Sequence, residues 1–508
     1  MTGPVSSPAP ETDICLIVEG CYPYVPGGVS AWIDWLLRTQ AQTSFQVVVL
    51  WPKPTGQQPR YALPPNVTAL HHLYLQDFGA EPVKSLRLPQ GMENLAEALG
   101  ALIAVGGRHN LARVSDALGR AQNSLSLPIL FNSPVAWDIA RRSYEREMPY
   151  GSFLHYFWAW RALLGGLLAA LEFAIPPAKV YHTISTGYAG VLAARAALET
   201  GRPSLLTEHG IYTNERRIEL LMADWVADTV DKGHAVADAR FDLRDMWVRA
   251  FEAYARTCYE CCTEVITLYE DNQRAQRLLG ASPRHLRVIA NGIDVARFAG
   301  LHQAGDSDRP TVALIGRVVP IKDVKTFITA IAILRARVPE ISALILGPTD
   351  EDPAYFEECR SLVGDLGLEG IIKFTGTVDV VQHLSRIHVV ALTSLSESQP
   401  LVILEAGAAG VPFVATNVGS CREILEGRPD ETPSLGPGGI ITGLVAPAEV
   451  ADALATLLLD PVLRRRYGET LRERVRRTYT SKRAADAYSE LYRHHIEAPP
   501  RETSKGAA

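Results

Sequence analysis

The sequence predicts an α/β protein with two domains, each built around a mostly parallel sheet that helices cover. Short apolar stretches alternate with amphipathic helical segments in both halves of the chain, most regularly after residue 310. Alternation of this kind requires right-handed crossovers and therefore parallel strands. The length of 508 residues also exceeds what one hydrophobic core usually contains.

A Gly- and Asp-rich segment separates the two domains and indicates a linker. Both ends of the chain are rich in Pro and small polar residues, which predicts disorder. The expected parts are a leader (1–12), a first domain (13–298) with a helical insertion at about 81–172, a linker (299–309), a second domain (310–480), a crossover helix (481–497) and a disordered tail (498–508).

The first domain begins with a strand at 13–20, which leads through Gly27-Gly28 into an amphipathic helix. Trp32, Trp35 and Leu36 share one face of this helix, so they are expected to point inward. Glycines at a strand-to-helix turn allow a ligand to approach the backbone closely, although a tight turn alone explains them equally well. Further strands are predicted at 45–51, 179–186, 203–210, within 264–272 and at 285–294.

One histidine of the first domain stands at a position where ligands bind. The strand predicted at 203–210 ends in His209-Gly210. Open α/β sheets bind ligands at the carboxyl ends of their strands, so His209 is a candidate site residue rather than only a structural one.

The helical insertion contains an aromatic-rich run. Phe153, Phe157 and Trp160 recur there at helical spacing, which favours core packing. A lipid-facing surface or a platform for an acceptor sugar is the alternative.

In the second domain, an apolar run ends in a polar loop at 393–398, which meets a helix that Pro400 can start. Glu397 and Glu405 therefore lie on either side of a helix N-terminus. The exposed N–H groups and the positive dipole end attract an anion, while the carboxylates accept hydrogen bonds from hydroxyls. A ligand with both phosphate and sugar hydroxyls fits this pocket.

Two cations are expected beside this pocket. Arg317 leaves the end of one strand and Lys322 enters the next helix, so both can point to the carboxyl edge of the sheet and clamp a diphosphate. Lys325 is interpreted as surface charge. The strands of this domain are predicted at 311–317, 342–348, 371–376, 389–394, 412–417 and 443–447.

Composition narrows the function classes. The net charge of −6 gives no case for nucleic acid as a generic partner, and no apolar run reaches membrane-spanning length. Seven scattered cysteines, including Cys258 and Cys261, indicate reduced thiols in a cytoplasmic protein. Asp350-Glu351-Asp352 matches a metal-binding DxD pattern, but its place after Gly347-Pro348 favours an ordinary turn.

Together these motifs resemble the retaining glycosyltransferases of family 4. The resemblance rests on Gly27-Gly28, His209-Gly210, the Arg317/Lys322 pair, Glu397-x7-Glu405 and NVGSCRE, which occur in the family's order. It implies the GT-B fold, in which two Rossmann-like domains face each other across an active cleft and C-terminal helices cross back to the first domain. Several stretches, such as TEHGIYTNER, are most similar to enzymes of Pel exopolysaccharide synthesis.

The resemblance also implies roles for individual residues. Glu405 would bind the ribose, Glu397 would face the donor sugar, and Arg317 with Lys322 would hold the diphosphate of the leaving UDP. The remaining candidates are His209 near the reacting centre, Gly27 and Gly28 near the phosphates or acceptor, Thr375 to Val378 at the base, and the Leu401 and Val402 backbone at the phosphates, because Pro400 has no N–H.

The implied reaction is transfer of a hexose from a UDP-sugar, most simply UDP-glucose, to a growing exopolysaccharide. No cofactor or metal is expected, because positioned cations and amides can stabilise the departing diphosphate. The family implies a membrane-bound synthase or export complex as partner. A nicotinamide oxidoreductase is disfavoured, since no G-x-G-x-x-G follows the first strand of either half. A non-catalytic subunit of a polysaccharide synthase complex remains the alternative.

Overall fold

The computed structural model describes residues 11–54, 56–76, 92–121, 134–222, 241–301, 304–306 and 308–501. These residues form two compact units. The first unit combines the chain up to residue 267 with 273–287 and the residues from 488 onward, and the second comprises 268–272 and 288–487. Most of the predicted leader and tail lies outside the described residues.

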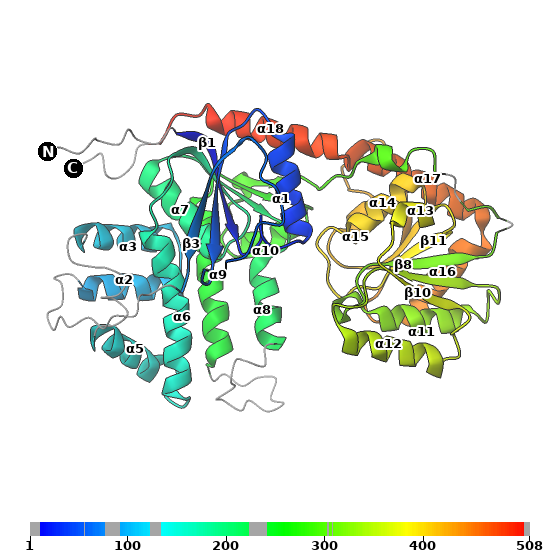
Figure 1. Ribbon diagram of the computed structural model, residues 1–508, viewed down its shortest axis with the longest axis horizontal. Helices are drawn as coiled ribbons and strands as arrows, with labels where there is room; N and C mark the ends of the chain where they lie inside the picture. Colours follow the sequence, from blue (N-terminus) through cyan, green and yellow to red (C-terminus); the bar gives the residue numbers. More distant parts are fainter. Residues whose placement is uncertain are drawn as a thin grey trace. The chain divides into compact units, whose positions relative to one another are not determined.

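The first unit contains a seven-stranded sheet with the order β3-β2-β1-β4-β5-β6-β7 (Figure 1). Neighbouring strands from β3 to β6 run parallel. The strands are β1 (Thr12–Glu19), β2 (Phe45–Trp51), β3 (Val67–Tyr74), β4 (Ala178–Thr183), β5 (Ser204–Glu208), β6 (Glu264–Thr267) and β7 (Leu286–Val288). β3 was not predicted, because its central His71-His72 interrupts the apolar alternation.

Helices cover this sheet and extend beyond it. The helix after Gly27-Gly28 buries Trp32 and Leu36 as predicted, whereas Trp35 is half-buried. The helices are α1 (Gly28–Thr39), α2 (Met92–Ala104), α3 (Arg108–Ala121), α5 (Pro134–Glu147), α6 (Phe153–Glu172), α7 (Tyr188–Thr200), α8 (Tyr212–Met222), α9 (Leu243–Cys261) and α10 (Asn272–Leu278). All seven cysteines of the chain are free.

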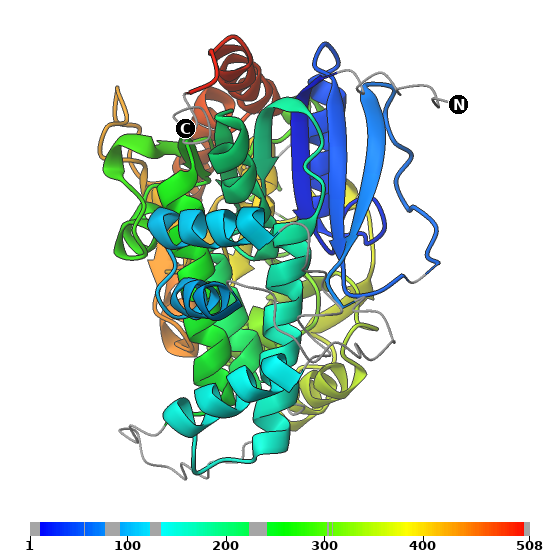
Figure 2. The same cartoon turned by 90° about the vertical axis from the view of Figure 1, so that its left-hand side faces the viewer.

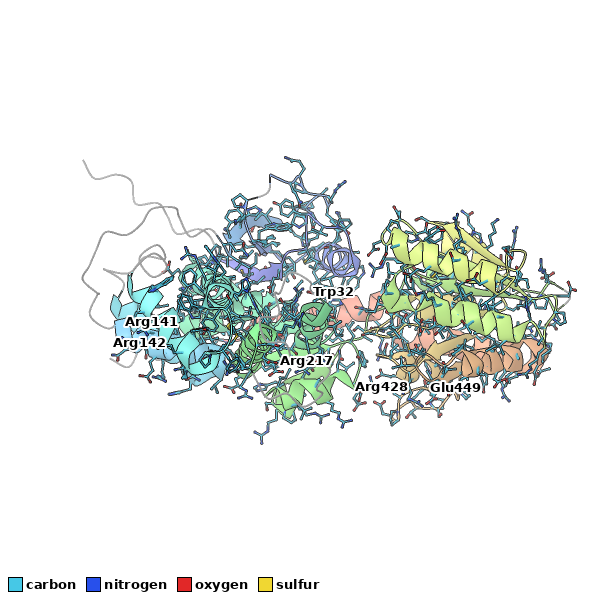
Figure 3. The ribbon with its side chains drawn as sticks, turned by 90° about the horizontal axis from the view of Figure 1, so that it is seen from below. Trp32, Arg141, Arg142, Arg217, Arg428 and Glu449 are labelled. Atoms are coloured by element: carbon cyan, nitrogen blue, oxygen red, sulfur yellow. The ribbon has the colours of Figure 1, made fainter. Side chains whose placement is uncertain are left out.

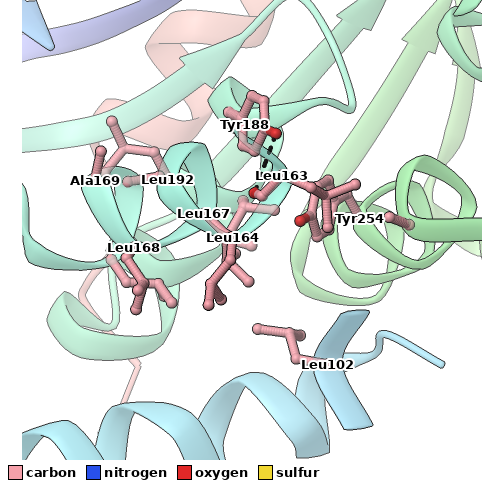
Figure 4. Close-up of a cluster of buried hydrophobic side chains, with 14 of the residues drawn as sticks. Leu102, Leu163, Leu164, Leu167, Leu168, Ala169, Tyr188, Leu192 and Tyr254 are labelled. Atoms are coloured by element: carbon pink, nitrogen blue, oxygen red, sulfur yellow. Dashed lines mark hydrogen bonds between the residues drawn. The ribbon is translucent and has the colours of Figure 1, made fainter. Parts of the chain in front are cut away.

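The predicted helical insertion forms α2, α3, α5 and α6, which gather beside the strands (cyan in Figure 2). One contact with the rest of the unit is a leucine-rich face of α6, which packs on Tyr188 and Leu192 of α7 and lies close to Tyr254 of α9 (Figure 4). The Tyr188 hydroxyl donates to the Leu163 carbonyl at 3.2 Å. Trp160 is buried as the core-packing interpretation predicts, while Trp158 on the same helix is exposed.

The second unit contains a six-stranded sheet with the order β10-β9-β8-β11-β12-β13, in which all neighbours are parallel. The strands are β8 (Thr311–Ile315), β9 (Ser342–Leu346), β10 (Ile372–Gly376), β11 (Val389–Leu392), β12 (Phe413–Thr416) and β13 (Gly439–Thr442). The last strand was predicted at 443–447, which is wrong. In that segment Val445 has φ 51° and Pro447 begins a helix, so it cannot extend a sheet.

Two helical layers enclose this sheet. One core joins α11, α12 and α16 to the sheet, and the other joins α14, α15 and α17 to its opposite face. The helices are η2 (Val295–Phe298), η3 (Pro320–Lys322), α11 (Val324–Leu334), α12 (Pro353–Asp365), α13 (Val380–Leu384), α14 (Leu401–Ala409), α15 (Cys421–Glu426), α16 (Pro447–Leu459), α17 (Pro461–Thr478) and α18 (Ser481–Ile496). Two parallel sheets with covering helices confirm the predicted α/β class.

The last helix, α18, contributes to both units. Its residues 481–487 belong to the second unit and its later residues to the first. There Tyr488 and Tyr492 are buried, and their hydroxyls bond Thr207 at 3.0 Å and His182 at 2.7 Å. None of the described helices combines the length and the apolar character needed to cross a membrane.

Candidate active site

The predicted diphosphate and sugar residues of the second unit follow two adjacent strands. From β8 the chain continues to β9 on one side, whereas β11, on the other side of β8, continues to β12 away from it. The strand order therefore reverses between β8 and β11, and the segments that follow these two strands diverge. Arg317 and η3 follow β8, and the loop that contains Glu397 follows β11. Open α/β sheets bind ligands at the carboxyl ends of strands at such a reversal.

Lys322 and Glu397 form an ion pair at this point. Lys322 Nζ lies 2.5 Å from Glu397 Oε1, and the two side chains are only 22% and 13% exposed. The Ser394 hydroxyl donates to the same carboxylate oxygen at 2.6 Å. The carboxylate is therefore held by two donors from different segments, which fixes its direction.

The loop between β11 and α14 is anchored on both sides. The Thr393 hydroxyl donates to the carbonyls of Lys322 and Asp323 at 3.1 and 2.9 Å. On the other side, the Ser420 N–H donates to the Ser398 carbonyl at 2.8 Å. These bonds tie the segments after β8, β11 and β12 into one edge.

Arg317 points to a different carboxylate. Its guanidinium pairs with Glu351, and both side chains are about half exposed, at 51% and 48%. The neighbouring Asp352 caps α12 by accepting the Tyr355 N–H at 3.0 Å. Within the described residues, Arg317 makes no hydrogen bond to Lys322 or Glu397, and no cluster of His, Cys, Asp and Glu could hold a metal ion.

Glu405 lies on α14, one turn into the helix. Burial raises the pKa of its carboxyl, and the positive charge of Arg297 opposes this rise. Pro400 was expected at the first helical position, but it is the N-cap, and the helix begins at Leu401. Leu401 and Val402 therefore supply first-turn N–H groups, which lack acceptors within a helix.

Thr375 and Val378 lie at and just beyond the end of β10. The Thr375 hydroxyl donates to the Ile345 and Gly376 carbonyls at 3.3 and 3.0 Å. Val378 is partly buried against the core on the α14 side of the sheet. Their place at the carboxyl edge suits the predicted contact with a base, and this role stays a prediction.

Gly27 and Gly28 form the start of α1 in the first unit. Gly27 is the N-cap and Gly28 the first helical residue. Among the described residues, no atom lies within 4 Å of a Cβ added at either glycine. These residues thus leave space beside this backbone, as close approach of a ligand requires.

His209 follows β5 in the same unit. Burial lowers the pKa of its imidazole to about 4, so the ring is neutral near pH 7. Its centroid lies 4.5 Å from that of Trp32, labelled in Figure 3, in an edge-to-face arrangement. A neutral imidazole can accept or donate a hydrogen bond without bringing a charge to the site.

Two residues that the sequence did not single out support these positions. Ser394 orients Glu397, and its place three residues earlier in the polar loop was the available signal. Glu208 precedes His209 and is 1% exposed. Burial raises the pKa of this carboxyl to about 7, although three hydrogen-bond donors oppose the rise. The sequence signal for Glu208 was its position as a carboxylate at the end of an apolar strand.

Two family models match the chain, one in each half. The model described as a domain of unknown function (DUF3492) matches residues 12–284, and the chain belongs to this family. The model described as glycosyl transferases group 1 matches residues 309–460. The second half of the chain thus carries a group 1 glycosyltransferase domain. The Lys322–Glu397 pair and α14 lie inside the segment that matches the group 1 model.

Curated relatives agree with this assignment. The D-inositol 3-phosphate glycosyltransferase of Saccharomonospora viridis is 27% identical over 335 residues, which covers 61% of this chain and 74% of the relative. A GDP-mannose-dependent phosphatidylinositol monomannoside mannosyltransferase of Mycobacterium tuberculosis is 30% identical over 221 residues, which covers 39% and 53%.

Solved structures show the same fold. HepE of Anabaena in complex with UDP aligns with a TM-score of 0.56 at 15% identity over 95% of this chain and 100% of that one. Sucrose-phosphate synthase of Thermosynechococcus elongatus aligns with a TM-score of 0.56 at 18% identity over 96% and 100%. The predicted GT-B fold is therefore confirmed.

Proposed function

We propose that this glycosyltransferase is a retaining, PelF-type enzyme of family 4 that transfers a hexose from a UDP-sugar, most simply UDP-glucose, to a growing Pel-type exopolysaccharide. The observation that carries the proposal is the largely buried Lys322–Glu397 pair at the β8–β11 reversal. It combines a cation for the diphosphate with a carboxylate for sugar hydroxyls. HepE, a neighbour in fold, has been solved with UDP and with UDP-glucose, which supports the choice of donor.

Departure of UDP places negative charge on the diphosphate. Lys322 and Arg317 would stabilise that charge, together with the first-turn N–H groups of α14. Donor binding would draw Lys322 from Glu397 toward phosphate and leave this carboxylate to accept sugar hydroxyls. Attack on the same face through an ion-pair-like state would then retain the anomeric configuration.

The setting of the reaction is also proposed. The enzyme would act in the cytoplasm, and a membrane-bound synthase or export complex would receive its product. Any contact with the membrane would then be peripheral and made through that complex.

The donor assignment can be tested with a panel of nucleotide sugars in which base and sugar vary separately. Calorimetry should show binding of UDP and UDP-glucose, and product analysis should show transfer with retention. Lys322→Ala should weaken UDP binding about tenfold or more, because it removes a charge-assisted bond. The matched control is Lys325→Ala, since Lys325 pairs with Glu358 on the exposed side of α11 and α12.

Preference for a guanine or adenine nucleotide would contradict the UDP-sugar donor. Tight UDP binding without hydrolysis or transfer to any acceptor would instead favour the second candidate, a non-catalytic GT-B subunit of a polysaccharide synthase complex.

A further inference from the structure

Glu208, the last residue of β5, accepts hydrogen bonds from three elements of the first unit. Its Oε2 accepts the Tyr259 hydroxyl of α9 at 2.7 Å and the Gln276 amide of α10 at 2.9 Å. Its Oε1 accepts the backbone N–H of Tyr212 at 3.1 Å. α8 and α9 pack on each other (Figure 1), so this buried carboxyl lies where several elements meet.

The hydrogen bond from the Tyr212 N–H to Glu208 joins the two ends of the loop that contains His209. Tyr212 is the first residue of α8, where backbone N–H groups have no acceptor within the helix and a carboxylate is favourable. Only residues 209–211 lie between Glu208 and Tyr212. The Tyr212 hydroxyl donates to Glu19 at the end of β1 at 3.0 Å, which ties the same loop to a second strand end.

Glu208 and His209 serve different sides of the sheet. The ring of His209 packs against Trp32 of α1, whereas the contacts of Glu208 are to α9 and α10. Successive residues at a strand end point in opposite directions. Glu208 therefore acts on the reaction through the loop rather than by touching a sugar.

We infer that Glu208 is a positioning residue, which holds the 209–211 loop between β5 and α8 and thereby fixes His209 for hexose transfer. This inference rests on the proposed function and adds a buried residue to its site.

The test compares Glu208→Ala with Glu208→Gln. The alanine variant should lower kcat about tenfold to a hundredfold, because small misplacements of a reacting-centre group have effects of this size. KM for the UDP-sugar and the affinity for UDP should change less than about threefold, since the diphosphate and sugar residues belong to the other unit. Deuterium exchange of the peptide that spans 207–213 should become faster.

The glutamine variant should restore most of kcat. The amide oxygen of the new glutamine can accept the Tyr212 N–H. Its NH2 group can donate to Gln276 Oε1 once the Gln276 amide turns. This oxygen is buried and has no hydrogen-bond partner among the described residues. Glu264→Gln on neighbouring β6 is the matched control, because it weakens the contact with His495 and leaves the loop intact. If Glu208→Ala does not fold, Glu208→Asp replaces it, since its shorter side chain cannot reach Tyr212 and Tyr259 together.

The inference would be overturned if Glu208→Ala kept the kcat and the deuterium exchange of the wild type. It would also be overturned if Glu208→Gln folded but lost as much activity as Glu208→Ala. If the wild type transfers from no nucleotide sugar, the proposed function fails. The exchange of the 207–213 peptide then decides by itself whether Glu208 holds the loop.

Discussion

Under the proposed function, Lys322 and Glu397 exchange partners when a donor binds. Each lies largely out of solvent, and each currently neutralises the other. Removal of one member of such a pair leaves an uncompensated buried charge, which is costly unless a ligand replaces it. On this proposal, Lys322 would leave Glu397 only for another anion, such as the diphosphate of the donor.

The two glutamates of the second unit should separate binding from turnover. Glu405→Ala should weaken UDP binding about tenfold, because it loses the proposed ribose contact. Glu397→Ala should chiefly lower kcat, because its carboxylate is proposed to face the donor sugar. Calorimetry with UDP and initial rates with UDP-glucose measure these effects.

Glu358→Ala is the control for this pair of variants, since its carboxylate binds only the exposed Lys325 in the described structure. If both site variants bind UDP and turn over like the parent, the two roles are wrong.

At the scale of elements, the turn after β12 supports the loop that carries Glu397. Gly419 has φ +52°, and a Cβ there would lie 2.2 Å from the Ser398 carbonyl oxygen and 2.3 Å from that of Glu397. Neither backbone oxygen can move without shifting the loop. Glycine is therefore required at this position by conformation and by space.

Gly419→Ala should lower both stability and kcat. The positive φ costs about 1–2 kcal/mol, and the clash adds to it. Gly436→Ala is the matched control, because Gly436 also has a positive φ, +82°, but no atom of the described residues lies within 4 Å of an added Cβ. Urea unfolding and rates with UDP-glucose provide the comparison. Equal effects of both substitutions would show that the clash does not matter.

The sequence predicted most strands because apolar runs bounded by polar or glycine residues are local signals. The prediction failed for β13, because the actual strand GIIT (439–442) and the predicted segment GLVAP (443–447) are similarly apolar. Only the backbone conformation of Val445 and the helix start at Pro447 distinguish the two segments. The sequence also predicted that Lys322, at the entry to a helix, and the loop with Glu397 lie at the carboxyl edge of the sheet. Their pairing could not be predicted, because the two residues lie 75 positions apart and no spacing rule gives such a distance.

At the scale of the whole molecule, α18 completes the core of the first unit. Tyr492 bonds His182 at 2.7 Å, both are fully buried, and the two residues are 310 positions apart. Burial lowers the pKa of His182 to about 3, so its neutral ring depends on this hydroxyl for one hydrogen bond.

Tyr492→Phe should therefore destabilise the first unit by about 1–3 kcal/mol, because a buried imidazole nitrogen loses its bond. UDP affinity should not change, since the proposed UDP-binding residues belong to the second unit. Thermal unfolding and calorimetry test both statements. Tyr467→Phe on α17 is the control, and a Tyr492→Phe protein as stable as this control would contradict the expectation.

The shared helix also sets an order of synthesis. Residues 268–272 and 288–487 of the second unit are made before Tyr488 and Tyr492, which belong to the first unit. The first unit therefore cannot cover His182 and Thr207 until the second unit has been synthesised. The unit whose synthesis begins first thus depends, for its complete core, on residues made after the whole of the other unit.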